Sequence, residues 1–122
     1  MKLMYYSEGN GVYVCDRTQI DPKTGDYKRV AWISNGGNII YYAKNISSEA
    51  REKVKSHAEE IGEKFRERFE KMDAITQFQT IMDSAPFKQV YNGKLNLREI
   101  SKDTSSIIQQ LPKLREIYYL TA

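Results

Sequence analysis

Few side chains in this sequence could carry chemistry, and most of those favour binding over catalysis. The chain holds one cysteine and one histidine, Cys15 and His57, which leaves no set of ligands for a zinc site and no serine or cysteine motif that would use His57 as a base. The glycine clusters Gly9-Asn10-Gly11 and Asn35-Gly36-Gly37 are not followed by a predicted helix, so neither matches a phosphate-binding loop. No spaced carboxylate loop of the calcium type is present. We therefore predict no catalytic residue, no metal site and no cofactor, and hence a protein that is not an enzyme.

Aromatic and basic side chains are the better functional candidates, because they occur together in the same short stretches. The chain has nine tyrosines, four phenylalanines and one tryptophan. A nucleotide base stacks on an aromatic ring, arginine binds phosphate through two hydrogen bonds, and asparagine can bond a base edge. The same pattern is also typical of cross-strand pairs in a sheet core with Lys and Arg at the rim. The residues predicted to bind a ligand are Arg29, Arg98 and Arg115 for phosphates, Phe87 or Tyr91 for stacking, and Asn92 for a polar edge or for a turn alone.

Charge is distributed unevenly along the chain. Nineteen Lys and Arg face sixteen Asp and Glu, which gives a net charge of +3. Residues 1–46 and 85–122 carry the basic excess, whereas residues 47–84 are acidic. A long duplex would be repelled by the acidic middle, but an anion of nucleotide size suits the basic flanks if they share one sheet. Long nucleic acid is therefore not an expected partner.

Hydropathy and cysteine content indicate the compartment. No apolar run approaches the roughly 20 residues that span a bilayer, and no signal-peptide pattern is present. A single cysteine excludes an internal disulfide and fits a reducing environment. We therefore expect a cytoplasmic protein with no membrane partner, which would be in the host cytoplasm if a phage encodes it. The length of 122 residues predicts one domain, residues 1–122.

Four predicted strands, joined by short turns, form the first third of the chain. Residues 2–7, 12–15, 27–34 and 38–44 are rich in β-branched and aromatic side chains, and Gly, Asn, Asp and Pro separate them. Simple alternation in the third strand places Arg29 on the face of Ala31 and Ile33, opposite Trp32. Residues 39–42 are apolar on both faces, so we expect this strand to be covered on both sides, by helices on one and by a partner or a C-terminal strand on the other.

A long helical section is predicted next. From Ser47 the apolar residues recur every three or four positions up to Ile75, which is typical of one helical stripe. The helix should begin at a serine N-cap and break near Gly62 or Asp73 into a second helix. A stripe of this length exceeds what a small sheet can cover, which predicts a homo-oligomer.

The last third is predicted to return to strands. Asn92-Gly93 between alternating runs favours a tight hairpin. Asp103 or Thr104 should cap a short helix that ends at Pro112, and residues 114–120 should close the chain as a strand. The predicted fold is thus α+β: an antiparallel sheet, made of an N-terminal four-strand meander plus C-terminal strands, packed on a long kinked helical section.

The order of these elements resembles the phage anti-Thoeris sponge family over the whole chain, with residues 30–42 closing the meander before the helical section. The resemblance implies binding of cyclic ADP-ribose isomers, signals of bacterial immunity that such proteins sequester without cleavage. It also implies a pocket with an aromatic residue for adenine and Asn and Arg for ribose and phosphates. Counterparts in this sequence would be Phe87, Asn92, Arg29, Arg98 and Arg115. Residues 29–60 are also similar to small domains carried by conjugative elements.

The function predicted from the sequence is non-enzymatic sequestration of a small anionic nucleotide signal of the cyclic ADP-ribose type, which would counteract host antiviral defence. Two alternatives stay open. One is an inhibitor or accessory factor of a phage or mobile element that acts on a larger protein partner through its helix face. The other is a single-stranded nucleic-acid binder that uses the aromatic sheet.

Overall fold

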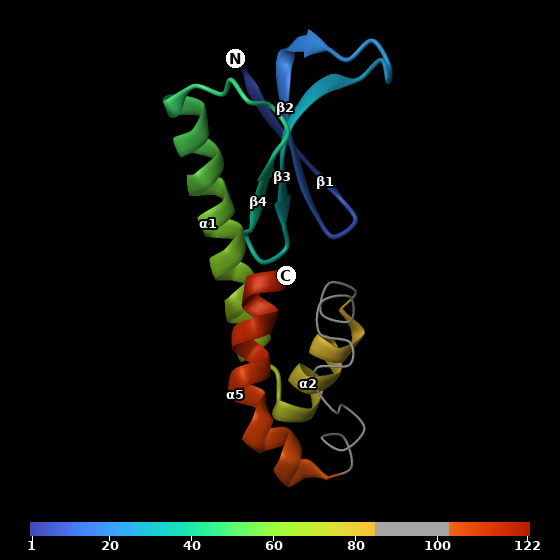
Figure 1. Cartoon of the computed structure of the whole chain (residues 1–122), viewed down its shortest axis with the longest axis vertical. Helices are drawn as coiled ribbons and strands as arrows, with labels where there is room; N and C mark the ends of the chain where they lie inside the picture. Colours follow the sequence, from blue (N-terminus) through green and yellow to red (C-terminus); the bar gives the residue numbers. More distant parts are fainter. Residues whose placement is uncertain (85–102) are drawn as a thin grey trace. The chain divides into compact units, whose positions relative to one another are not determined.

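The computed structural model describes residues 1–84 and 103–122, which fold as α+β in two compact units, Met1–Lys64 and Phe65–Ala122 (Figure 1). The single domain, residues 1–122, stays a prediction. The hairpin predicted at Asn92-Gly93 lies outside the described residues. Within the described part of the chain, no helix is both long enough and apolar enough to cross a membrane.

The first unit contains the four-stranded antiparallel sheet that the sequence predicts. Its strands are β1 (Leu3–Glu8), β2 (Gly11–Ile20), β3 (Tyr27–Ser34) and β4 (Ile39–Tyr41). They pair in chain order, β1-β2-β3-β4, each antiparallel to the next. Short turns at the predicted positions make the meander, because an antiparallel neighbour needs only a few connecting residues.

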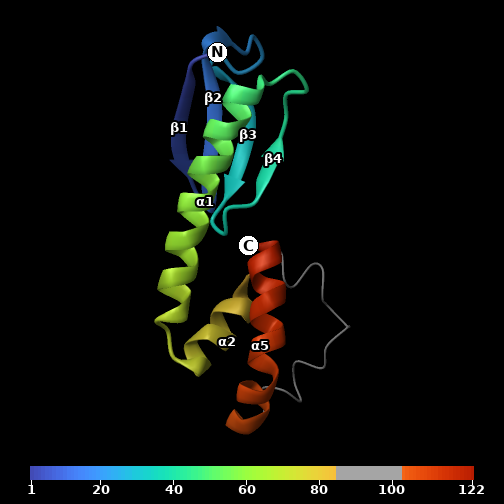
Figure 2. The same ribbon diagram turned by 90° about the vertical axis from the view of Figure 1, so that its left-hand side faces the viewer.

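Helix α1 (Ser48–Glu70) begins in this unit and covers one face of the sheet, as Figure 2 shows. It starts where predicted, because the Ser47 hydroxyl accepts a hydrogen bond from the Ala50 amide at 3.2 Å. Val54 and Ala58 of the helix are fully or almost fully buried against strand residues. The strand side of this core is Val14, Val30, Ala31 and Ile33. The other face of the sheet is the one that α1 leaves uncovered.

A glycine contact holds the turn between β3 and β4 against α1. Gly37 has φ +82°, and a Cβ built on Gly62 would lie 2.9 Å from the Gly36 carbonyl oxygen. Such a distance is below ordinary contact, so only glycine lets the helix approach this closely. Gly62 is therefore buried inside a continuous helix, and the predicted helix break does not occur there.

We expect Gly62→Ala to lower the free energy of unfolding by about 1–3 kcal/mol, since the added methyl group must push the turn away. If only helix propensity mattered, the same substitution would raise the free energy of unfolding by about 1 kcal/mol. The sign of the measured change therefore distinguishes the close contact from helix propensity. Urea denaturation measures it, with Glu63→Ala at the exposed neighbouring position as the control. A Gly62→Ala variant as stable as the parent would disprove the close contact.

The second unit is built from the end of α1, α2 (Ala74–Asp83) and α5 (Thr104–Thr121). The predicted break at Asp73 is confirmed: its carboxylate accepts a hydrogen bond from the Thr76 amide at 2.8 Å and caps α2. The predicted apolar stripe ends earlier than expected, because Met72 and Ile75 are 37% and 41% exposed. The core consists of Phe69, Phe78, Ile81, Ile107, Leu111, Leu114 and Tyr118.

The strand predicted for residues 114–120 is wrong, and so is the helix end at Pro112. Both stretches belong to α5, with Pro112 inside the helix. Its buried residues Ile107, Leu111, Leu114 and Tyr118 recur at helical spacing. An interior proline costs about 3 kcal/mol, whereas each large apolar side chain contributes about 1.5–3 kcal/mol on burial. Packing of this face therefore outweighs the proline.

Candidate functional site

The face of the sheet that points away from α1 carries a continuous row of large side chains, one from each strand. Tyr6 pairs with Tyr13, Tyr13 with Trp32, and Trp32 with Ile40. Residues directly opposite on neighbouring strands share one face, so these four, called the outer row here, cross the whole sheet. Ring centroids are 5.6 Å apart for Tyr6 and Tyr13, and 4.6 Å apart for Tyr13 and Trp32.

The outer row is open at the β4 end. Ile40 is 57% exposed and Tyr42, just beyond β4, is 52% exposed. Ile39 and Tyr41 pack against the core below α1, as expected, while Ile40 is not part of that core. Coverage of the outer face of this strand by a partner stays a prediction. The C-terminal strand that was expected to cover it is part of helix α5.

Gly11 positions the indole of Trp32. A Cβ built on this buried glycine would lie 2.4 Å from a ring carbon of Trp32 and 2.4 Å from the Ile33 carbonyl oxygen. The ring therefore occupies the space that a side chain at position 11 would need. An aromatic ring packed on a glycine of the neighbouring strand stabilises the pair and fixes the ring against the sheet.

A β-bulge brings Arg29 onto the outer face. Val14 pairs with Ala31 but Cys15 pairs with Arg29, so Val30 is an extra residue in β3. Val30 and Ala31 are both buried in the core. The alternation that placed Arg29 opposite Trp32 is therefore wrong, because the bulge shifts the pattern by one residue. Bulges often redirect a side chain in this way beside functional sites.

The guanidinium of Arg29 lies over the outer row. Its guanidinium carbon is 3.9 Å from the centroid of the Tyr13 ring, and its Nη2 donates a hydrogen bond to the Tyr6 hydroxyl at 3.3 Å. This hydrogen bond is the main reason why the pKa of Arg29 is raised. Nη2 also lies 3.8 Å from a Glu8 carboxylate oxygen, in a pair of which both partners are about half exposed. An exposed pair contributes little, so a phosphate can replace Glu8.

A hollow of about 380 Å³ adjoins the row on the same face. We call it the aromatic hollow; it is lined by Met4, Tyr6, Cys15, Asp26, Tyr27 and Arg29. Cys15 is only 2% exposed. The pKa of the Cys15 thiol is raised, chiefly by burial. The positive charge of Arg29 opposes this shift, and the negative charge of Asp26 adds to it. The thiol is thus neutral near pH 7. The volume lies within the range of small-ligand sites, roughly 300–1,000 Å³.

Two of the six residues predicted to bind a ligand lie in the described parts of the chain, one in each unit. Arg29 lies on the outer face of the first unit, and Arg115 lies in α5 of the second. Arg115 lies near Tyr119: the pKa of Tyr119 is raised, chiefly by burial, and the positive charge of Arg115 opposes that shift. The remaining four, Phe87, Tyr91, Asn92 and Arg98, lie outside the described residues.

The sequence reasoning missed Tyr13 and Trp32. A signal was present, because positions at equal distance from the Gly9-Asn10 turn face each other, which pairs Tyr6 with Tyr13. Between β2 and β3 the same count fails: starting from Ile20 opposite Tyr27 it would pair Tyr13 with Ser34, because the register shifts twice before Tyr13 reaches Trp32.

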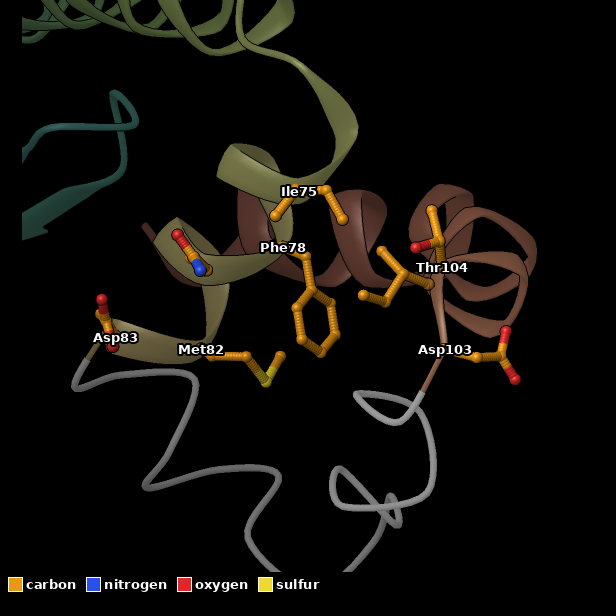
Figure 3. Close-up of a pocket in the computed structure, with 8 residues that line it drawn as sticks. Ile75, Phe78, Met82, Asp83, Asp103 and Thr104 are labelled. Carbon is orange, nitrogen blue, oxygen red and sulfur yellow. The ribbon is translucent and has the colours of Figure 1, made fainter.

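A second hollow, of about 410 Å³, lies between α2 and α5 in the other unit (Figure 3). Phe78, Met82 and Ile107 make it largely apolar, and its charged lining residues are Asp83 and Asp103. The Asp103 carboxylate already accepts a hydrogen bond from the Ser106 amide at 2.8 Å. Acidic and apolar groups do not attract a phosphate, so this hollow is not the candidate site.

In the described part of the chain, no group of three or more His, Cys, Asp and Glu side chains is placed to hold a metal ion. Comparison with protein-family models, curated proteins and solved structures finds no match. The outer row, Arg29 and the aromatic hollow are therefore the observations from which function is argued.

Proposed function

We propose that the chain is a non-enzymatic binding protein for a small anionic nucleotide. Its base stacks on the outer row at the aromatic hollow, and its phosphate pairs with Arg29. The observation that carries the proposal is the guanidinium of Arg29, held 3.9 Å above the Tyr13 ring at the edge of a hollow of nucleotide size. Aromatic surface and a fixed cation side by side match the two chemical halves of a nucleotide.

Physical magnitudes support this pairing. Stacking of a base on an aromatic ring contributes about 1–3 kcal/mol. A guanidinium can form two parallel hydrogen bonds to a phosphate, and stacking on Tyr13 reduces the side-chain freedom that binding must remove. The Asp26 carboxylate at the hollow can accept hydrogen bonds from ribose hydroxyls or a base amine. Nothing in this arrangement requires cleavage of the ligand.

The biological role follows from the family resemblance and is part of the proposal. A protein that binds a nucleotide signal without cleaving it lowers the free concentration of that signal. Cyclic ADP-ribose isomers are therefore the first ligands to test, and sequestration of such a signal would counteract host antiviral defence.

The single tryptophan of the chain is a built-in probe, because Trp32 belongs to the outer row. We expect cyclic ADP-ribose isomers and ADP to change its fluorescence, and calorimetry to give the same dissociation constants. Tyr6→Leu should weaken binding at least fivefold, since it removes a ring of the row and the acceptor of Arg29. Tyr5→Leu is the matched control: the neighbouring tyrosine stacks on His57, with centroids 4.1 Å apart, on the face that α1 covers.

Two results would contradict the proposal. One is the absence of heat and of any fluorescence change with every nucleotide tested. The other is an equal loss of affinity in Tyr5→Leu and Tyr6→Leu when both variants are folded by circular dichroism. Either result would leave two predictions standing, the protein partner and the single-stranded nucleic acid.

A single-stranded nucleic acid is a second candidate, and the length of the outer row favours it. The row crosses all four strands and ends at the exposed Ile40, so successive bases could stack along it. A ten-nucleotide thymidine strand should then bind more tightly than any mononucleotide, with a steep salt dependence. Tighter binding of the mononucleotide would favour the first proposal.

A further inference from the structure

Strand β4 is an edge strand of the sheet, and large apolar side chains are exposed along it (Figure 2). The order β1-β2-β3-β4 gives β4 a neighbouring strand on one side only in the part of the chain that the structure describes. All three residues of β4 keep some exposure, and Ile40 is 57% exposed. Tyr42, directly after the strand, is 52% exposed.

The backbone of β4 presents hydrogen-bonding groups to this open edge. The Ser34 amide donates to the Asn38 carbonyl oxygen at 2.9 Å, and the Tyr42 amide donates to the Val30 carbonyl oxygen at 2.9 Å. In an antiparallel pair, alternate residues bond the same neighbour, so Ile40 between these two positions also points its N–H and C=O to β3. The N–H and C=O groups of Ile39 and Tyr41 therefore point to the open edge.

The sequence does not protect this edge. An exposed edge strand is normally guarded by charged side chains or proline, because its unpaired backbone groups otherwise bind another strand. Residues 30–43 contain no charged side chain and no proline. The other edge strand, β1, has Lys2 before it and Glu8 at its end. Of the two edges, β4 is thus the one that is suited to accept a further strand.

We propose that the chain forms a two-fold symmetric dimer in which β4 of one copy pairs antiparallel with β4 of the second. An axis at Ile40 places this residue opposite Ile40 of the second copy, and Ile39 opposite Tyr41. In this register every residue of β4 faces a residue of β4. Ile39 and Tyr41 exchange hydrogen bonds through the groups that point to the open edge, and the two Ile40 side chains pack on each other across the axis.

A second copy fits this edge better than an unrelated strand, because both faces of the pairing are self-complementary. On the outer face, exposed Ile40 meets its own copy. On the face that α1 covers, the half-buried side chains of Ile39 and Tyr41 meet each other. The first charged residue after the strand, Lys44, lies opposite Gly36 of the second copy, so no like charges meet.

The dimer leaves the candidate site open. No residue of β4 lines the aromatic hollow, and Ile40 lies at the opposite end of the outer row from Tyr6, which does line it. Pairing of two β4 strands continues the outer row from one copy into the next, so one sheet face carries two separate sites. The inference does not depend on the proposed function, since no ligand takes part in the pairing.

Charge exchange at position 40 tests the axis. In sedimentation, the mass of the parent should rise from 14.2 kDa toward twice that value. The interface is small, so a range of about 1 to 500 µM is needed. Ile40→Lys and Ile40→Glu should each stay monomeric, because like charges then face each other across the axis, and an equimolar mixture of the two should dimerise again. Ile20→Lys, at a position that is 58% exposed at the end of β2, is the matched control and should dimerise like the parent.

Cysteine cross-linking tests the register. Directly opposed residues that are not hydrogen-bonded have Cα atoms about 4.5 Å apart, which a disulfide can span. Ile40→Cys should therefore form a disulfide-linked dimer on mild oxidation. Tyr42→Cys is the control and should form at least fivefold less, because the two copies of residue 42 lie about 13 Å apart along the paired strands. Cys15 is only 2% exposed, so it contributes little background.

Three results would overturn the pairing, provided that the variants are folded by circular dichroism. They are a parent that keeps the monomer mass at every concentration, an Ile40→Lys variant that dimerises like the parent, and equal cross-linking of Ile40→Cys and Tyr42→Cys. A monomeric parent would leave the β4 edge to a strand of another protein, which is the protein-partner alternative.

Discussion

Arg29→Met is expected to weaken ADP binding at least tenfold while the thermal unfolding transition stays close to that of the parent. Methionine keeps an apolar stem on the Tyr13 ring but removes the guanidinium that lies over this ring beside the aromatic hollow. Stability should change little, because the pair with Glu8 is exposed and such pairs contribute little. Calorimetry with ADP and melting by circular dichroism measure the two effects separately.

Arg51→Met is the control for this experiment. Its guanidinium carbon lies 4.6 Å from the centroid of the Tyr41 ring, so it repeats the stacked arginine on the face that α1 covers. It should leave ADP binding within twofold of the parent. Glu8→Gln should strengthen binding, since Glu8 competes with phosphate for Arg29. A loss of affinity in Arg51→Met as large as that in Arg29→Met would show a general charge effect and would remove Arg29 from the site.

Gly11→Ala is expected to lower the free energy of unfolding by about 1–3 kcal/mol and to shift the emission of Trp32. The new methyl group would lie 2.4 Å from both the Ile33 carbonyl oxygen and the indole. The backbone oxygen belongs to the sheet and cannot move away cheaply, so the ring or the strand pair must shift. Urea denaturation followed through Trp32 fluorescence reports both changes.

Gly25→Ala provides the comparison. Nothing lies within 4 Å of a Cβ at this turn position, but its φ of +75° disfavours alanine. We therefore expect a loss of about 1–2 kcal/mol from backbone conformation alone, with the Trp32 emission unchanged. If Gly11→Ala left both the free energy of unfolding and the Trp32 emission at the parent values, the Trp32 indole would not pack against Gly11.

Local signals explain why the sheet and α1 could be predicted from the sequence. Turn residues divide the first third of the chain, and Ser47 is an N-cap that acts within its own helical turn. Pro112 is also a local signal, but it misleads, because α5 is stabilised by residues far away in sequence such as Phe69 and Phe78. The residues that surround Pro112 in the sequence therefore do not indicate these contacts.

The candidate site was harder to predict for a related reason. Arg29 was chosen for its chemistry and lies at the site, but its neighbours Tyr13 and Trp32 come from strand register. The segment after β4 is held to β3 by hydrogen bonds that the amides of Tyr42 and Ala43 donate to the Val30 carbonyl oxygen. Register, bulges and loop anchoring are properties of strand pairs, so residue types along one strand do not reveal them.

The bulge at Val30 changes which residues of β3 face outward, even-numbered on one side of it and odd-numbered on the other. After it, even-numbered Trp32 points to the outer face; before it, odd-numbered Arg29 does. A relative that lacks Val30 would have simple alternation here: Ala31 would stay opposite Val14 and Arg29 opposite Cys15, but the helix-facing core would lose one buried side chain. Gain or loss of one codon at this position therefore changes the core beneath α1 and leaves the ligand face as it is, so a gap at position 30 in an alignment of relatives predicts a difference in stability and none in ligand binding.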